Sequence, residues 1–412
     1  MSKPLSKRVA VLGTLDTKGD EIALLCQQIK ALGHQPVTFD VGVVGQPTIT
    51  PDFDRSQIAN AGGTAIETLL ETPTRQNAVP VMVAGTTALL RQQLDAGDLD
   101  AVVALGGTQG SSLCCQVMQA LPYGLPKIMV STVASGDTSA FVGIKDITMM
   151  FSVCDLLGLN PLTRKILAAA AGAACGMAQA QDNIDSALSS RPTIGMTNLG
   201  VLTDGTMIAK QLFEDAGFDV MVFHAVGSGG LAMEQMMKEG LLVGVFDYGL
   251  GEISDELFDG LRAANPQRLT VAGQLGLPQV ICPGGAEHIG VFVDEPNVLP
   301  ERFKDHLHVF HSPLILAPRL KPNEFCRVAL EVCRRLQRAS GPTCVMFPGG
   351  GTSRYGVERG PLRDPAGDTA FLEVLRQNLP SHVELIECAE HAEHPAFVKR
   401  AVDKLVAMIE QT

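Results

Sequence analysis

The sequence predicts an α/β protein with two Rossmann-like, doubly wound parallel-sheet domains and a cleft between them. Three observations predict this fold. Short apolar segments alternate with amphipathic stretches of helical length, several apolar segments run into Gly-rich loops, and the pattern restarts after a polar stretch at Asp182 to Pro192. Strands that alternate with helices form βαβ units and therefore parallel sheets.

The composition indicates a large packed protein. At roughly 100–200 residues per domain, 412 residues make two or three domains. Hydrophobic residues make up 46% of the chain, which is enough for a large core and excludes a disordered or fibrous protein. The 10 cysteines are scattered without metal-type C-x-x-C spacing, so we expect them to be reduced and mostly buried.

The charge balance argues against a nucleic-acid partner. The formal net charge is −12 and the longest basic cluster is Arg334-Arg335, so the surface repels a phosphate backbone. There is no run of about 18 apolar residues and no apolar segment of signal-peptide type near the start. We therefore expect a cytoplasmic protein that does not cross a membrane.

The first Rossmann-like domain is predicted to span residues 1–185. A buried strand at residues 8–12 runs through a Gly-rich loop into a helix at 21–32, which Gly33 ends. The stretch VPVMVA at residues 79–84 looks like a strand but opens a segment of helical length. The other elements keep the alternation, with strands at 35–39, 101–105 and 127–131 and helices at 58–71, 79–96, 111–120 and 164–181.

The second Rossmann-like domain is predicted to span residues 192–412. A strand at 193–196 leads to a helix at 206–216, and a strand at 219–224 leads through Gly227 to Gly230 into a helix at 231–239. Further strands at 242–246, 279–282 and 343–347 and a last helix at 395–410 complete it. Open parallel sheets bind ligands beyond the carboxyl ends of their strands, so we expect the site in the cleft between the two domains.

Gly-rich turns follow at least five of the predicted strands and indicate a site for an anion. Glycine lets backbone N–H groups approach a phosphate, and the dipole of the following helix favours negative charge. Tight α/β turns also favour glycine without any ligand, and none of the loops has P-loop or G-x-G-x-x-G spacing. The predicted ligand-binding residues are Gly13, Thr14, Gly106, Gly107, Thr108, Ser111, Ser135, Gly136, Lys145, Gly227, Ser228, Gly229, Gly230, Gly284, Gly285, Gly349, Gly350, Gly351, Thr352 and Ser353.

Asp16, Lys18 and His288 are the predicted catalytic residues. A lysine at a helix N-terminus is unfavourable against the helix dipole, and a bound phosphate or carboxylate would resolve the conflict. An ordinary N-cap arrangement is the alternative. His224 ends a predicted strand and His288 follows Gly285-Ala286-Glu287, and either imidazole can serve as a general acid or base.

Two groups of side chains have the chemistry of metal ligands. His306, His308 and His311 allow a zinc site, but no Cys or Glu stands at ligand spacing, so a structural role is favoured. Carboxylates that can hold Mg²⁺, or simply cap helices and turns, are Asp40, Asp137, Asp146 and Asp247.

Longer motifs carry a resemblance to a known family. They are residues 13–19, 106–108, 129–136, 142–147, 223–230, 277–280 with 283–285, and 364–371. These segments resemble an uncharacterised bacterial and fungal family that includes the N-terminal, ATP-binding domain of the tomato protein conferring resistance to tomato mosaic virus. The resemblance covers nearly the whole chain and implies two α/β subdomains, ATP binding and a homodimer.

Two segments depart from the usual pattern of that family. The run Ala286-Glu287-His288-Ile289 stands where an Asp-Met pair is usual, and His311-Ser312-Pro313 replaces a His-Asn-Pro run. If these positions shape a substrate pocket, the chain belongs to a subfamily with a different ligand.

The function predicted from the sequence is ATP or other nucleotide binding by an enzyme of small-molecule metabolism that acts in the interdomain cleft, with Mg²⁺ as an accompanying ion. A non-catalytic sensor of a nucleotide or sugar phosphate is one alternative, and a sugar-nucleotide transferase or epimerase is another.

Overall fold

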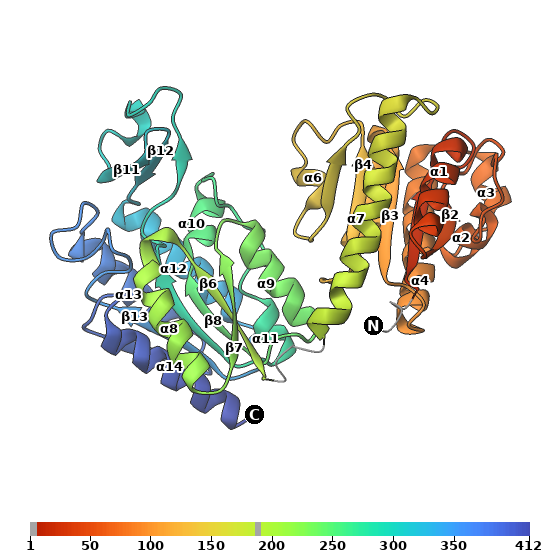
Figure 1. Ribbon diagram of the computed structural model, residues 1–412. Coiled ribbons are helices and arrows are strands. Elements are labelled where there is room, and N and C mark those ends of the chain that lie inside the picture. Colours follow the sequence, from red (N-terminus) through yellow and green to blue (C-terminus); the bar gives the residue numbers. More distant parts are fainter. Residues whose placement is uncertain (1–5, 186–190) are drawn as a thin grey trace. The chain divides into compact units, whose positions relative to one another are not determined.

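The computed structural model describes residues 6–185 and 191–412, and only the backbone of residues 182–185. The chain divides into two compact units, Met1–Leu188 and Ser189–Thr412, called here the N-terminal and C-terminal domains (Figure 1). Each domain is built on a parallel sheet with helices on both faces, which confirms the predicted fold class.

The N-terminal sheet has five parallel strands in the order β2-β1-β3-β4-β5. Counted along the chain, this is the 2-1-3-4-5 order of doubly wound sheets. The strands are β1 (Arg8–Gly13), β2 (Gln35–Asp40), β3 (Ala101–Gly106), β4 (Lys127–Ser131) and β5 (Thr148–Phe151).

Both faces of the N-terminal sheet are buried, and the sequences of its central strands are therefore continuously apolar. Val9 and Val11 of β1 pack on one face, where α1 (Gly19–Ala31) and α7 (Pro161–Asp185) lie. Ala10 and Leu12 pack on the other face. The helices associated with that face are α2 (Arg55–Ala61), α3 (Ile66–Glu71), α4 (Arg75–Asp95), α5 (Thr108–Gln119) and the short α6 (Ser139–Val142).

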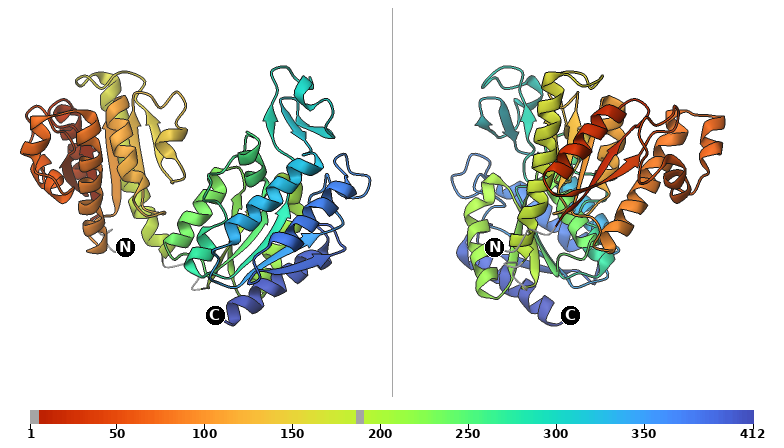
Figure 2. Two further views of the ribbon diagram at one scale, coloured as in Figure 1. Left: turned by 180° about the vertical axis from the view of Figure 1, so that it is seen from behind. Right: turned by 45° about the vertical axis from the view of Figure 1, so that its right-hand side comes forward.

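The C-terminal sheet repeats this order and adds a sixth strand, giving β14-β13-β9-β8-β6-β7. The strands are β6 (Thr193–Asn198), β7 (Asp219–His224), β8 (Gly244–Gly249), β9 (Gln279–Gly284), β13 (Thr343–Pro348) and β14 (Glu384–Cys388). Helices cover both faces of this sheet, as the views in Figure 2 show. One face carries α8 (Thr203–Asp215) and α14 (Pro395–Glu410), and the other carries α9 (Ser228–Lys238), α10 (Gly251–Leu257), α11 (Val271–Leu275), α12 (Pro322–Leu336) and α13 (Pro365–Asn378).

A small antiparallel sheet, called here the arm, is inserted between β9 and α12. It consists of β10 (Val291–Phe292), β11 (His308–Ser312) and β12 (Ile315–Pro318), in the order β10-β12-β11. In Figure 1 the arm projects beyond the carboxyl ends of the C-terminal sheet. It therefore stands on the edge where sheets of this kind bind ligands.

One predicted helix is wrong in detail. The helix predicted at 58–71 is two helices, α2 and α3, because the chain turns at Gly62 and Gly63, where Gly63 has φ +85°. A Cβ on Gly62 would lie 2.2 Å from the carbonyl oxygen of Val81, so glycine allows α2 and α4 to approach closely. The helix predicted at 79–96 is confirmed as part of α4, and the strand-like run at 79–84 lies inside it, because tertiary packing overrides its β propensity.

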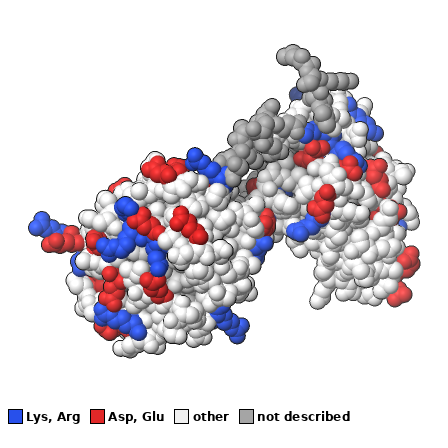
Figure 3. All heavy atoms as spheres, turned by 90° about the horizontal axis from the view of Figure 1, so that it is seen from below, with Lys and Arg blue, Asp and Glu red and all other residues white. Residues whose placement is uncertain are grey.

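Charged side chains are mixed on the surface. On the face drawn in Figure 3, acidic and basic groups alternate with wide neutral areas, and no single basic patch dominates. In the part of the chain that the structure describes, no helix is both long and apolar enough to cross a membrane.

Candidate functional site

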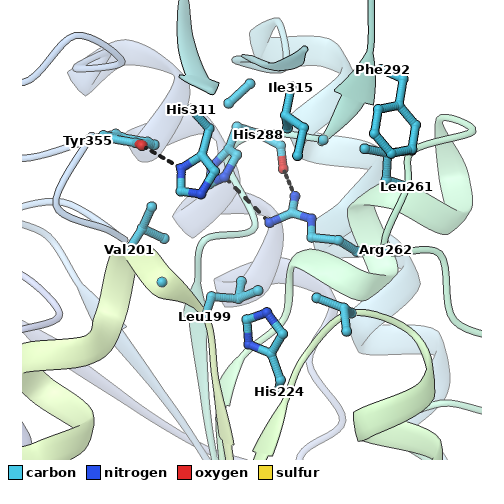
Figure 4. Close-up of a pocket in the computed structure, with 14 residues that line it drawn as sticks. Leu199, Val201, His224, Leu261, Arg262, His288, Phe292, His311, Ile315 and Tyr355 are labelled. Carbon is cyan, nitrogen blue, oxygen red and sulfur yellow. Dashed lines mark hydrogen bonds between the residues drawn. The ribbon is translucent and has the colours of Figure 1, made fainter. Parts of the chain in front are cut away.

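A pocket of about 340 Å³ opens in the C-terminal domain, and three histidines line it (Figure 4). We call it the histidine pocket. Its walls are mostly aliphatic, with a few polar groups between them. The lining residues are Leu199, Gly200, Val201, His224, Val226, Leu261, Arg262, His288, Gly290, Phe292, His311, Ile315, Ala317 and Tyr355.

The strand order explains the position of the pocket. From β6 the chain crosses first to β7 on one side and then to β8 on the other, so the switch point of the sheet lies between β6 and β8. Leu199 to Val201 directly follow β6, and His224 is the last residue of β7. The pocket therefore forms where the diverging connections leave a crevice.

Arg262 is held rigidly at the pocket wall. Its Nε and Nη2 donate to the two carboxylate oxygens of Asp255 at 2.9 and 2.8 Å, and Nη2 also donates to the carbonyl of His288 at 2.8 Å. Asp255 is fully buried. A bidentate pair with a buried carboxylate fixes the guanidinium plane, and it leaves Nη1 as the nitrogen without a carboxylate partner.

His288 faces Arg262 through its ring. Nε2 lies 3.4 Å from Nη1 of Arg262, and because a guanidinium only donates, Nε2 must accept. The ring proton then belongs on Nδ1, which is 3.3 Å from Oε1 of Glu287 but outside hydrogen-bond geometry. The nitrogen with a lone pair is thus the one directed toward Arg262 (Figure 4).

Glu287 joins the turn after β9 to the turn after β13. Its carboxylate accepts hydrogen bonds from Thr352 Oγ1 at 2.8 Å and from the Ser353 hydroxyl. Burial raises the pKa of the Glu287 carboxyl, but its neighbours His288 and Arg319 outweigh burial and help to lower the pKa to about 2. Glu287 is therefore a permanent anion beneath His288.

A second polar pair lines the pocket, with His311 from the arm and Tyr355 from the loop after β13. His311 Nδ1 and the Tyr355 hydroxyl lie 3.0 Å apart, and the Tyr355 ring meets the His288 ring edge-on at 5.9 Å. Burial raises the pKa of Tyr355, and Arg354 opposes this rise. The phenol therefore stays protonated at neutral pH and can donate a hydrogen bond into the pocket.

The structure brings together only some of the predicted site residues. The predicted catalytic residue His288, the candidate base His224 and His311 share the histidine pocket. Both segments that depart from the family's usual pattern thus contribute a lining side chain, His288 and His311. Arg262, Asp255 and Tyr355 were not predicted, because they stand in loops or short helices with no motif around them.

The Gly-rich loops of the C-terminal domain already hold the protein's own groups. The amides of Gly227 and Gly230 donate to Glu252 Oε1 at 2.7 and 3.1 Å, and Glu252 is fully buried. Ser228 begins α9 directly after this turn. The remaining loop glycines lie against backbone or packed side chains that leave little or no room for a Cβ: Gly229, Gly284, Gly285, Gly349, Gly350 and Gly351.

In the N-terminal domain, the loops after β1 and β3 lie at the switch point of that sheet. Gly13 and Thr14 close β1, and Gly107 is the N-cap of α5 without any side-chain cap. A Cβ on Gly106 would lie 2.9 Å from Gly110 Cα, so this glycine allows α5 to start beside β3. Ser111, one turn into α5, bonds to Ser131 at 2.6 Å, while Ser135 and Gly136 lie in an exposed turn.

Both predicted lysines have partners inside the protein. Lys18 is the N-cap residue of α1, and its ammonium donates to the carbonyl of Leu156. Lys145 is buried, with its ammonium 3.8 Å from the centre of the Tyr123 ring. The Asp16 side chain packs against Gly45, where a Cβ would lie 2.3 Å from Oδ2.

The four aspartates proposed for Mg²⁺ each have a separate protein partner. Asp40 accepts from the amides of Leu15 and Gly42, and Asp137 accepts from the amide of Ser139. Asp146 pairs with Lys127 and Asp247 pairs with Arg268. Across residues 6–181 and 191–412, no group of three or more His, Cys, Asp or Glu side chains is placed to hold a metal ion.

The chain is similar in sequence to bacterial proteins over their full length and to part of a longer plant protein. A UPF0261 protein of Clostridium tetani is 35% identical over 99% of this chain and 100% of its own length. The ToMV resistance protein Tm-1(GCR237) of Solanum lycopersicum is 27% identical over 93% of this chain, which spans only 54% of that protein.

Among solved structures, the UDP-GlcNAc 2-epimerase of Methanocaldococcus jannaschii, in complex with UDP-GlcNAc and UDP, is similar over 97% of this chain and 92% of its own. Its sequence identity is 9% and its TM-score 0.24, values too low to argue from. The family models match both halves of the chain, the N-terminal domain model at residues 7–183 and the C-terminal domain model at residues 191–409. The chain therefore belongs to the uncharacterised protein family UPF0261.

Proposed function

We propose that this protein is an enzyme of small-molecule metabolism that binds an anionic metabolite in the histidine pocket and moves a proton on it. The contact between Arg262 and His288 carries the proposal. A guanidinium held in place by a buried carboxylate and an imidazole nitrogen lie 3.4 Å apart at the wall of a cavity of about 340 Å³. An anion-binding group beside a proton acceptor is the minimum arrangement for acid–base catalysis.

The roles follow from the hydrogen bonds. Arg262 binds the anion through Nη1, because Asp255 occupies its other edge. His288 takes or returns the proton at Nε2, and the Glu287 carboxylate beside Nδ1 stabilises the imidazolium that forms. The Tyr355 hydroxyl, in the loop after β13 and supported by His311 of the arm, supplies a second hydrogen bond.

Hydrogen exchange in D₂O tests the proposal directly. A panel of small acids is first screened by thermal unfolding, and those that stabilise the protein are then followed by NMR for loss of a C–H signal. We expect His288→Gln to slow this exchange by about 10²–10⁴-fold while keeping the thermal shift. His382→Gln, a change of the same type on an exposed residue, is the control. Equal exchange in the wild type and His288→Gln would contradict the proposal.

We further propose that the N-terminal domain binds a nucleotide, with ATP as the first candidate. The support is the uncapped N-terminus of α5, which begins with the exposed residue Thr108 at the switch point between β1 and β3. The first-turn N–H groups of a helix have no acceptor within it, and a phosphate supplies one. Mg²⁺ would arrive with the phosphates.

A substitution at Gly107 tests the proposed nucleotide site at the N-terminus of α5 without removing a side chain. Gly107→Asp places a carboxylate at the N-cap, where it caps α5 and repels a phosphate. A Cβ here is tolerated, because its nearest neighbour would be Thr132 Oγ1 at 3.7 Å. ATP at about 100 times its Kd should add about 2.7 kcal/mol to the stability of the wild type. Gly107→Ala should keep this shift and Gly107→Asp should lose it.

Thermal unfolding and hydrogen exchange also distinguish the proposed enzyme from a non-catalytic sensor and from a sugar-nucleotide enzyme. A non-catalytic sensor would show a thermal shift without proton exchange, and a sugar-nucleotide enzyme would respond to UDP-sugars rather than to ATP. The homodimer that the family resemblance implies stays a prediction, as does a site shared between the domains. Sedimentation equilibrium with and without ligand would decide the subunit count.

A further inference from the structure

We infer that the ligand of the histidine pocket is a small monocarboxylate with an apolar body, and not a phosphate ester. The inference rests on the proposed function of the pocket and narrows its substrate class. It follows from the donors and charges that the protein leaves available there.

The charge in the pocket suits at most one negative group. Among the lining residues, all of which the structure describes, Arg262 is the one permanent cation. Asp255 already faces its guanidinium in a bidentate pair, and Glu287 adds a second buried carboxylate beneath His288. A phosphate dianion would bring two charges to a site with no excess of positive charge, whereas a carboxylate brings one.

The donors that a phosphate would need are already used. Phosphate sites in proteins typically combine several backbone N–H groups with hydroxyls and cations. Here the amides of Gly227 and Gly230 donate to Glu252, and the hydroxyls of Thr352 and Ser353 donate to Glu287. The loops that resemble a phosphate cradle in sequence therefore bind carboxylates of the protein itself.

One strong donor remains at the wall. Nε and Nη2 of Arg262 are engaged by Asp255, and one N–H of Nη1 faces His288 Nε2, so the other N–H of Nη1 is left to bind an anion. One charge-assisted hydrogen bond, with further help from the Tyr355 hydroxyl, is enough to orient a carboxylate. A carboxylate bound to Nη1 would lie near His288 Nε2, because the two nitrogens are 3.4 Å apart.

The rest of the wall is suited to an apolar body. Leu199, Val226 and Ile315 line the cavity, and Phe292 of the arm is 67% exposed although it also lines the pocket. An apolar ligand that covers the Phe292 ring removes this surface from water, which favours binding. A cavity of about 340 Å³ lies at the small end of ligand pockets.

A matched pair of probes tests the inference on the full chain. Benzoate and phenyl phosphate share the same ring and differ in the anion, so we would measure the Kd of each by NMR titration at pH 8, where phenyl phosphate is a dianion. We expect benzoate to bind at least about tenfold more tightly. Phe292→Ala should weaken benzoate at least about threefold. Leu314→Ala, which removes a 46% exposed side chain of the arm outside the pocket, should leave it unchanged.

The outcomes separate this inference from the proposed function. Phenyl phosphate that binds as tightly as benzoate, and is weakened by Phe292→Ala, would overturn the carboxylate inference and leave an anion site in the pocket. If neither probe responds to Phe292→Ala or to Arg262→Lys, the pocket is not the anion site, and both the inference and the proposed function fail. Tight benzoate binding that Phe292→Ala weakens supports both.

Discussion

At the scale of single residues, Glu287 links the chemistry of the pocket to the stability of the domain. Its pKa of about 2 lies below the ordinary value of 4.5, so its ionised form stabilises the fold. This contribution is present above pH 4.5 and is lost as the pH falls toward 2. The difference corresponds to roughly 3 kcal/mol. We expect Glu287→Gln to flatten the fall of the unfolding free energy between pH 5 and pH 3, as measured with urea.

A control variant tests whether the predicted loss of stability at low pH is due to Glu287. Glu358→Gln changes an exposed glutamate and should leave the pH dependence of the wild type intact. If Glu287→Gln and the wild type lose the same free energy between pH 5 and pH 3, the ionised Glu287 does not stabilise the fold.

Glu234 on α9 should show the opposite pH dependence. Burial raises the pKa of this carboxyl from 4.5 to about 7, although Arg268 opposes the rise. The stability due to its proton is therefore present below pH 4.5 and is lost as the pH rises to about 7. At pH 8, we expect Glu234→Gln to be more stable than the wild type by about 1–3 kcal/mol in urea unfolding. A variant that is less stable at pH 8 would show that Glu234 is needed as an anion beside Arg268.

The turn at Gly227 to Gly230 shows what local sequence can and cannot predict about a loop. The Gly-rich turn at Gly227 to Gly230 was predicted to bind an anion, and its amides do hold one. That anion is Glu252, which stands 22 residues after Gly230 in the chain. Local sequence shows that a loop has free donors, but only the tertiary fold shows which acceptor fills them.

At the scale of elements, the glycines of α4 and α7 make a matched comparison. In α4, a Cβ on Gly85 would lie 1.8 Å from the carbonyl of Ile58 in α2, so Gly85→Ala must push these helices apart. We expect a loss of about 1–3 kcal/mol from this overpacking. In α7, Gly176 is exposed and a Cβ there would meet no atom within 4 Å. Gly176→Ala should stabilise by about 0.5–1 kcal/mol.

Thermal or urea unfolding of the two alanine variants checks this comparison. Destabilisation by both would show that α7 does not remain helical around Gly176. Stabilisation by both would show that α2 and α4 are not in close contact.

Elements with a strong local pattern were predictable, and elements defined by long-range contacts were not. The helix at Pro395–Glu410 has a clear apolar face and was predicted at these bounds. The arm pairs β10 with β12 across more than 20 residues, and its β10 is only two residues long. Such a strand is too short for a periodic pattern. His311 of β11 and Tyr355 are 44 residues apart, so nothing in the local sequence indicated that they face each other.

At the scale of the whole molecule, the apolar cores are separate. The core clusters around Ala10 and Val9 contain residues of the N-terminal domain, and the clusters around Ile194, Leu250 and Met233 contain residues of the C-terminal domain. A domain with its own core can unfold by itself. We therefore expect differential scanning calorimetry of the full chain to show two unfolding transitions rather than one.

Ligands should then move these transitions separately, because binding stabilises only the unit that binds. ATP should raise the transition of the N-terminal domain, and Gly107→Asp should abolish that rise. Benzoate should raise the transition of the C-terminal domain, and Phe292→Ala should reduce that rise. One transition that both ligands raise would mean that the domains unfold together, with energetic coupling that the separate cores do not supply. That result would favour the predicted interdomain site over two independent ones, because a ligand held by both domains makes them unfold as one unit.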